Sequence, residues 1–349
     1  MGKRRLNQAL RGAALAVTLG SAACGGDGDG GADGGTTGGG GGCTPSGATV
    51  LADYAEFDKS PAYSMHLFGD RLFVQYIEQV VELPAAGGAP VQRYKTPNAF
   101  STGIATYPRN GSELVLVPSG NVPITVLAVA GGAGTQPTLD RTDELIVGYD
   151  AGTDALVAQV TNTADTHDLA LVPMDGSPRR VVLAAQPGNS FIAQWDIKGG
   201  AAIRRFEGSS SAIQLVTLAD GAMRTIALSP SALRVHHLTA THLFYAHGET
   251  LEQNGIWRRP LAGGAAEQVV DAFIAGGSFV AGSGRYAFHA ADRIFTFTDA
   301  APGVAATQTD LPVAGTGCTS HSVAVSADSV FSTMYRTLVG TSMVFRVAR

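Results

Sequence analysis

The sequence predicts an all-β fold, a single β-propeller of seven four-stranded blades. Three observations lead to this prediction: a phrase that recurs every 43 to 45 residues, a strand–turn–strand pattern in each copy, and the lack of any helical period ten residues long within a copy. Four short strands repeated at this spacing are typical of propeller blades. Six or eight blades stay open as alternatives, because residues 98–145 and 300–320 are harder to divide.

The repeat is built around glycine-containing turns. Its copies surround five glycines that lie 43 to 45 residues apart, namely Gly88, Gly132, Gly176, Gly221 and Gly264. A weaker copy surrounds Gly303, and two further strand-like runs, such as 71–78 and 242–249, precede the phrase in each unit. Gly-Gly and Asp-Gly pairs supply the positive φ that two-residue hairpin turns require. We therefore expect a tight turn between the last two strands of each blade.

The two ends of the repeat complement each other. Residues 49–55 resemble the second half of the phrase without a first half, whereas the chain stops at Arg349, where the next turn should begin. A last blade without its outer strand would leave backbone hydrogen-bonding groups unpaired. We therefore expect residues 49–55 to pair with residues 342–349 and to complete the blade built from 321–349.

Residues 1–23 predict a lipoprotein signal peptide. Four basic residues within the first 11 positions precede a short apolar run and a stretch of small residues, as in secretory signals. Residues 21–24, S-A-A-C, resemble a bacterial lipobox, although that motif usually begins with Leu where this chain has Ser21. Cys24 is therefore expected to be the lipidated first residue of the mature chain. Plain secretion without lipidation is the alternative.

Residues 24–47 predict a flexible tether that begins with the lipid-bearing Cys24, and residues 48–349 form the propeller domain. The stretch 25–42 contains only Gly, Asp, Ala and Thr, so it has no apolar side chain worth burying. A globular head on such a tether predicts a cell-envelope protein that touches the membrane through its lipid anchor only. The outer membrane is favoured, with the propeller in the periplasm or at the cell surface.

The charge distribution argues against nucleic-acid binding. Of the 24 Lys and Arg residues, four lie in the signal, which leaves 20 against 29 Asp and Glu residues in the mature chain. No basic cluster remains outside the signal, and such clusters are the usual footprint of a nucleic-acid partner.

Two strands carry a resemblance to a known family. The runs H-L-F-Y at 242–245 and G-I-W-R-R-P-L-A-G-G at 255–264 resemble the repeat units of TolB-like propellers and of uncharacterised propeller lipoproteins from Gram-negative bacteria. The resemblance covers the whole globular part and implies architecture and an envelope location. It implies no particular activity, because propellers host many unrelated functions.

Histidines are the first candidates for site chemistry. Four of them lie close together in the sequence, namely His236, His237, His242 and His247. Metal ligands must converge on one point, but side chains five positions apart in a strand face opposite sides, as His242 and His247 do. We therefore expect no metal site here. His237 precedes Phe244 as His66 precedes Phe73, which indicates a repeated blade-packing position, and His321 is placed at the central channel.

Residues 161–168, T-N-T-A-D-T-H-D, are predicted to form the loop between the second and third strands of their blade. Asp165, His167 and Asp168 are candidates for contacting a cation, an acid–base role or a partner, although polar residues in loops need no special reason. With Glu249 and Glu252 they mark the face that carries the longer connections. Because loops on a rigid scaffold usually carry function, we expect this acidic face to dock a partner.

Cys43 and Cys318 are the cysteines that follow Cys24. Exported chains tend to oxidise their thiols in pairs. The two residues, however, precede strands that start at opposite ends of an antiparallel blade. Residues 43–48 could fold back by up to ~17 Å, so the sequence leaves a bridge between Cys43 and Cys318 open.

The sequence lacks the usual catalytic motifs. It contains no G-x-S-x-G elbow and no phosphate-binding P-loop. We therefore expect a non-catalytic binding or scaffolding module for an envelope protein or glycan, without a cofactor. The alternative is a metal-dependent hydrolase or lactonase-like propeller enzyme, for which Asp196 and Glu144 are the candidate inner-strand carboxylates. A purely structural envelope protein is a third possibility.

Overall fold

The structure is a computed structural model whose described residues belong to one globular unit. The chain divides into two units, Met1–Gly38 and Gly39–Arg349. The described residues all lie in the second unit, and they are 43–45, 47–54, 61–97, 103–119, 122–139, 144–163, 165–188, 195–205, 212–229, 232, 234–247, 255–271, 279–282, 284–290, 293–298, 307–311, 317–336 and 340–348. The predicted signal peptide, Cys24 and the tether up to residue 42 therefore lie outside the described residues.

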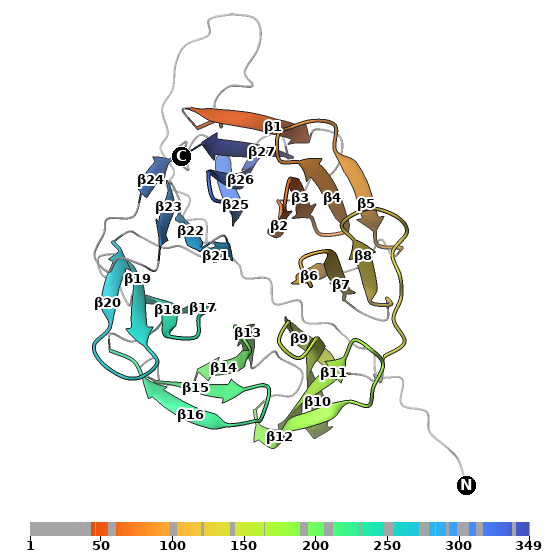
Figure 1. The fold of residues 1–349 in the computed structure, drawn as a ribbon, viewed down its shortest axis with the longest axis vertical. Coiled ribbons are helices and arrows are strands. Elements are labelled where there is room, and N and C mark those ends of the chain that lie inside the picture. The colour runs from red at the N-terminus through yellow and green to blue at the C-terminus, as the bar shows by residue number, and fades with distance from the viewer. Residues whose placement is uncertain are drawn as a thin grey trace, which may run out of the picture. The chain divides into compact units, whose positions relative to one another are not determined.

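Seven antiparallel sheets surround a common centre as the blades of a propeller (Figure 1), which confirms the predicted fold class. Blade 1 contains β2 (Ser64–Phe68), β3 (Arg71–Gln75), β4 (Gln79–Pro84) and β5 (Val91–Lys95). Blade 2 contains β6 (Ile104–Arg109), β7 (Glu113–Pro118) and β8 (Thr125–Ala128). Blade 3 contains β9 (Leu145–Asp150), β10 (Ala155–Thr163), β11 (Thr166–Pro173) and β12 (Arg180–Pro187). Blade 4 contains β13 (Asp196–Lys198), β14 (Ala201–Arg205), β15 (Ala212–Thr217) and β16 (Met223–Ala227).

The remaining blades follow in chain order. Blade 5 contains β17 (Arg234–Leu238), β18 (His242–His247), β19 (Gly255–Pro260) and β20 (Glu267–Val270). Blade 6 contains β21 (Phe279–Gly282), β22 (Arg285–Ala290), β23 (Arg293–Thr298) and β24 (Thr307–Asp310). Blade 7 contains β25 (Cys318–Val325), β26 (Ser329–Arg336), β27 (Thr341–Ala348) and, on its outer side, β1 (Ala48–Tyr54).

The outer edge of blade 2 differs from that of the other blades. Its sheet has three strands, and an isolated antiparallel bridge joins Val126 of β8 to Thr135. The amide of each residue donates to the carbonyl of the other, at 2.8 Å and 2.9 Å. Thr135 thus occupies the place of an outer strand.

The N-terminal strand closes the propeller as the sequence predicts. β1 pairs antiparallel with β27, with Ala48 opposite Val347 and Tyr54 opposite Ser342. In Figure 1, β1 is the first strand of the described chain and lies along the outer side of β27, the last strand. The last blade therefore has four strands, and its outer strand comes from the opposite end of the chain.

A disulfide bond reinforces the same closure. Cys43 and Cys318 are bonded across 275 residues of sequence, with their Cα atoms 5.7 Å apart. The chain before β1 folds back across blade 7 to reach the start of β25, and the Thr44 hydroxyl lies 3.7 Å from the sulfur of Met343. Cys43 is buried. Cys43 and Thr44 thus pack against blade 7, although both lie within the predicted tether of residues 24–47.

Seven hydrophobic clusters hold the blades together, one at each interface between neighbours. In β18, Leu243 and Tyr245 pack in the cluster shared with blade 4, whereas Phe244 and Ala246 pack in the cluster shared with blade 6. Successive side chains of a strand point to opposite faces, so this strand is apolar on both. The continuous apolar runs of the sequence are therefore explained by burial on two sides.

The glycine turns differ from the predicted two-residue hairpins. The third strands of blades 1, 3 and 5 end at Pro84, Pro173 and Pro260. In each case the proline carbonyl accepts a hydrogen bond from the glycine amide three residues later, at 2.9 Å, 3.3 Å and 3.2 Å. Proline has no amide hydrogen to donate to an outer strand, so pairing stops there and the connection is longer than two residues. The prediction of two-residue turns is therefore wrong at these positions.

Helices are not found among the described residues, and that part of the chain accordingly includes no helix that could cross a bilayer.

Ring closure can be tested on β1 with a matched pair of variants. Leu51 is buried in the cluster that joins blades 7 and 1, together with Phe331 and Val344, whereas neighbouring Val50 is 42% exposed. We expect Leu51→Ala to lower the free energy of unfolding by ~2–4 kcal/mol, since large-to-small changes in a core cost this much. Val50→Ala should change it by less than ~0.5 kcal/mol. Urea unfolding measures both, and equal effects would contradict the packing of β1 in the ring.

Candidate functional site

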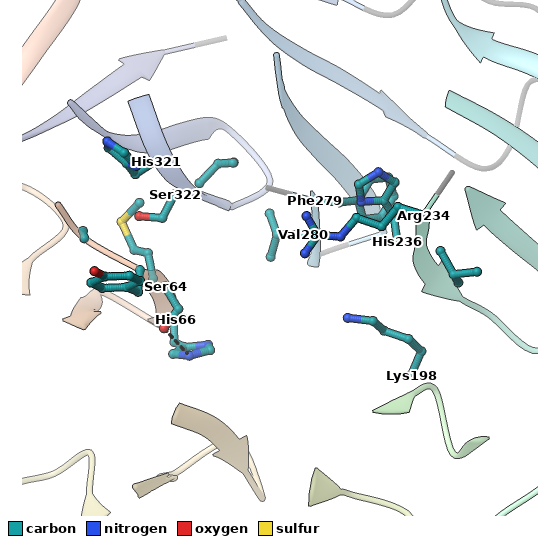
Figure 2. Close-up of a pocket in the computed structure, with 14 residues that line it drawn as sticks. Ser64, His66, Lys198, Arg234, His236, Phe279, Val280, His321 and Ser322 are labelled. Atoms are coloured by element: carbon teal, nitrogen blue, oxygen red, sulfur yellow. Dashed lines mark hydrogen bonds between the residues drawn. The ribbon is translucent and has the colours of Figure 1, made fainter. Parts of the chain in front are cut away.

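A cavity of about 390 Å³ lies between the inner strands of five blades. Its lining residues come from β2, β13, β17, β21 and β25 and from the two residues before β2. Figure 2 shows side chains from these strands around one open space. Concave sites of this size with a few polar groups are the usual places for small ligands.

The charged side chains of the described lining are both cationic. Lys198 is the last residue of β13, and Arg234 is the first residue of β17. Neither forms an ion pair with a carboxylate that the structure describes. Both side chains extend toward the open centre of Figure 2. Burial lowers the pKa of Lys198, the charge of Asp196 opposes that shift, and the charge of Arg234 adds to it.

His236 supplies a third nitrogen group to the cavity. A register shift between Val235 and His237 marks a bulge in the pairing of β17 with β18. The His236 ring stacks on Phe279 with centroids 5.8 Å apart. His237 stacks on the same ring at 5.6 Å, so the bulge brings two successive histidines to one side. Bulges commonly redirect a side chain in this way.

The Nε2 atom of His236 has no hydrogen-bond partner among the described residues, although the side chain is only 7% exposed. A buried polar atom without a partner costs free energy. Burial, with the positive charges of Arg234 and Lys198, lowers the pKa of His236 to about 3. The imidazole is therefore neutral near pH 7.

His66 faces the cavity from blade 1, but its ring is already engaged. Its Nε2 atom lies 2.8 Å from the Thr106 hydroxyl, and Ser64 bonds to both Thr106 and Gln75, at 2.7 Å and 2.6 Å. Burial lowers the pKa of His66 to about 4, and a hydrogen bond to Thr106 opposes the shift. This hydrogen-bond network joins blade 1 to blade 2, so His66 has a structural role that needs no ligand.

His321 lies on the inner strand β25 and lines the cavity, which is where the sequence analysis places it. Its Nε2 atom is 2.9 Å from the Thr319 hydroxyl, and its ring meets Tyr335 edge-on at 6.1 Å. Burial lowers its pKa. Nearby His289, in β22, is buried, and burial lowers its pKa to about 4.

Residues 161–168 do not form the predicted loop. Thr161–Thr163 are the end of β10 and Thr166–Asp168 the start of β11, with Thr161 opposite His167 and Thr163 opposite Thr166. His167 is fully buried, and its Nε2 atom accepts a hydrogen bond from the Trp195 indole at 2.9 Å. The prediction that His167 contacts a partner is therefore wrong, because the ring packs between blades 3 and 4.

The acidic residues of the same segment differ in role. Asp165 is exposed at the tip of the hairpin. Asp168 accepts hydrogen bonds from the Asn162 amide group at 2.5 Å and from the Ala185 backbone amide at 2.7 Å, so it holds β11 to β12. Glu249 and Glu252 lie outside the described residues. Asp165 is thus the described member of the predicted acidic face that is available to a partner.

The other sequence candidates do not gather at the cavity. Among the described residues, no group of three or more His, Cys, Asp or Glu side chains is placed to hold a metal ion. His242 bonds to the Thr241 hydroxyl at 2.9 Å, and His247 lies edge-on to Trp257 at 6.1 Å. Glu144 and Asp196 are not part of the cavity lining that the structure describes.

The repeated position of two histidines is confirmed. His237 stands opposite Phe244 in blade 5, and His66 stands opposite Phe73 in blade 1. Lys198 and Arg234 are not among the site residues predicted from the sequence, although both lie on the first strand of a blade. A search for cations on those strands alone would have found them.

Comparison with known proteins supports the fold. No protein-family model matches the chain, and no curated protein matches its sequence. Among solved structures, YCF48 bound to D1 peptide has a TM-score of 0.54 at 12% identity, over 86% of this chain and 96% of that one. The Pan2 WD40 domain of Neurospora crassa has a TM-score of 0.54 at 9% identity, over 88% and 98%.

A third similar structure is a puromycin-hydrolyzing peptidase of Mycobacterium tuberculosis, with a TM-score of 0.51 at 14% identity. The match covers 84% of this chain, which spans about half of the peptidase, 54% of its length. At these identities the likeness shows a seven-bladed propeller fold. It carries no information about activity.

The buried histidines predict that stability depends on pH. The pKa of His236 is lowered to about 3 and that of His289 to about 4, whereas an unfolded histidine has a pKa of ~6.5. Below pH 6.5 the unfolded chain therefore binds more protons than the folded one, so stability is full above this value and falls toward pH 4. Each histidine contributes up to ~1.4 kcal/mol per pH unit.

We expect the free energy of unfolding, measured with urea at pH 7.0, 6.0 and 5.0, to decrease along this series. His236→Gln should flatten the decrease, because the glutamine side chain does not titrate. Equal slopes for His236→Gln and the wild-type protein would contradict a neutral, buried His236.

Proposed function

We propose that this protein is an envelope-anchored lipoprotein whose propeller serves as a non-catalytic binding module. One observation carries the proposal: inner strands of five blades line a cavity in which Lys198 and Arg234 form no ion pair with a described carboxylate, and the His236 Nε2 atom has no described hydrogen-bond partner. Donor groups held in place without a protein partner are suited to holding a ligand.

The rigidity of the frame supports the same proposal. Seven interfaces, a shared outer strand and a disulfide bond fix the ring, and loops or side chains on such a frame keep one geometry for recognition. The cavity lining that is described has no carboxylate beside its cations, so it does not favour the alternative of a metal-dependent hydrolase or lactonase-like enzyme.

The envelope location is supported by the sequence of the N-terminus. A basic start, an apolar run and the S-A-A-C box lead to Cys24, and a Gly-rich stretch follows. An acyl chain contributes roughly 0.8 kcal/mol per buried CH₂, and more than one chain gives a stable anchor. In this proposal the propeller belongs with the lipoproteins that TolB-like repeats suggest, attached to the outer membrane, and its partner is an envelope protein or glycan.

Lipid anchoring can be tested at one residue. In a Gram-negative host, the wild-type chain should incorporate labelled palmitate and sediment with the membranes. Cys24→Ser should lose the label and appear in the soluble periplasmic fraction, because the sulfur is the acceptor of the lipid. Cys43→Ser serves as the control for removing a cysteine and should keep the label. A labelled Cys24→Ser protein would disprove the anchor.

The docking face can be tested with two charge reversals on opposite faces. Asp165 lies at the connection between the second and third strands of blade 3, and Asp220 lies in the turn between the third and fourth strands of blade 4. We expect cross-linking in cells, followed by purification and mass spectrometry, to capture an envelope partner with the wild-type protein and with Asp220→Arg. Asp165→Arg should capture less. Equal capture by both variants would contradict this face, and no capture above an untagged control would contradict docking of an envelope partner.

A further inference from the structure

The cavity has the chemistry of an anion site at one of its sides. Lys198 and Arg234 come from neighbouring blades 4 and 5, and His236 follows Arg234 by two positions on the same inner strand. Each presents nitrogen donors, and the described lining offers no carboxylate to receive them. A carboxylate or phosphate group accepts charge-assisted hydrogen bonds from such groups, and these are the strong ones.

This arrangement is unfavourable in the protein alone. The positive charge of Arg234 lowers the pKa of both Lys198 and His236, in addition to the larger effect of burial. Like charges in a confined space repel, and Asp196, whose charge acts on Lys198, is itself exposed and outside the described lining. The unpartnered Nε2 atom of His236, in a side chain 7% exposed, adds a desolvated group. An anion would satisfy all three groups at once.

The rest of the lining has an apolar part and a polar part, and the polar part consists of Ser64, His66, His321 and Ser322. Phe279 and Val280 of β21 stand beside these groups in Figure 2, and Met65 and Val323 line the cavity from blades 1 and 7. A bare inorganic ion would leave most of a 390 Å³ space unfilled. The volume lies within the ~300–1,000 Å³ range of small-molecule pockets. The part of the lining beside the cations, around Phe279 and Val280, thus suits a ligand with one acidic group and an apolar body.

We propose that the central cavity binds a small organic anion, whose carboxylate or phosphate group contacts Lys198, Arg234 and His236 and whose apolar body packs on Phe279. This inference rests on the proposed binding function and specifies the class of ligand that the module takes. It assigns no catalytic step to the cavity.

The probes are benzoate, phenyl phosphate, neutral benzamide and inorganic phosphate, titrated calorimetrically into the full chain carrying Cys24→Ser. Benzamide keeps the ring and removes the charge, whereas inorganic phosphate keeps the charge and removes the ring. We expect benzoate or phenyl phosphate to bind at least tenfold more tightly than benzamide, and phenyl phosphate more tightly than inorganic phosphate. Equal binding of benzamide and benzoate, or of the two phosphates, would overturn the inference, as would no binding of any charged probe.

Variants locate the binding and separate it from folding. Arg234→Met and Lys198→Met should each weaken binding at least tenfold, whereas Arg224→Met, on the outer strand β16, should leave the Kd unchanged. The cavity variants should melt at the same temperature as the wild-type protein or higher, because removing an unpaired charge relieves repulsion. Wild-type affinity in both cavity variants would overturn the inference. If one of the two cavity variants does not fold, the Kd of the other tests the site. A further test is the rise in Tm that the ligand causes, which His236→Phe should reduce.

Failure of this inference can be told apart from failure of the binding function. If the probes do not bind but an envelope partner is captured through the Asp165 face, the cavity assignment falls and the binding module stands. If the probes bind and no partner is captured, the module is a small-molecule receptor and the docking face falls.

Discussion

The pairing of β1 with β27 is the constraint on which the rest of the structure depends. It joins residues near both ends of the chain, Ala48 to Val347 and Tyr54 to Ser342, and the Cys43–Cys318 bond reinforces it. Because each blade packs on two neighbours, seven interfaces exist only while the ring is closed. The cavity depends on the same closure, since its walls come from blades at both ends of the chain.

Most of the architecture could be predicted, because the features that define it are local. The spacing of the turn glycines, the strand patterns and the spare N-terminal strand are written in linear order, and they led to the propeller and its closure. The errors occurred where pairing stops or starts. Pro84 and its equivalents end the third strands early, and β10 extends through Thr163 into the expected loop. Cys43, which the predicted tether includes, is bonded to Cys318.

The site could not be predicted in the same way, because its residues come from different blades and meet only at the centre of the ring. No pattern along the sequence marks such a meeting. Lys198 and Arg234 belong to different repeat units, and only the ring brings β13 and β17 to one cavity. Strand alternation places successive residues on opposite faces, and would therefore separate His236 from His237. The bulge between Val235 and His237 breaks that rule, so both rings meet Phe279. Nothing in the repeat signals that bulge.

The strands of a blade differ in how they pack, and this difference explains why polar groups without a described partner are tolerated at the centre of the ring. A second strand such as β18 supplies residues to two interfaces, so a polar side chain at any of its positions would weaken one of them. An inner strand has one edge without a strand partner, and that edge faces the channel. Cations at the ends of β13 and β17 therefore disturb no interface directly, and their repulsion is small against the apolar burial of the whole ring. The inner strands are thus the places where this fold can hold groups that a ligand, rather than the protein, would satisfy.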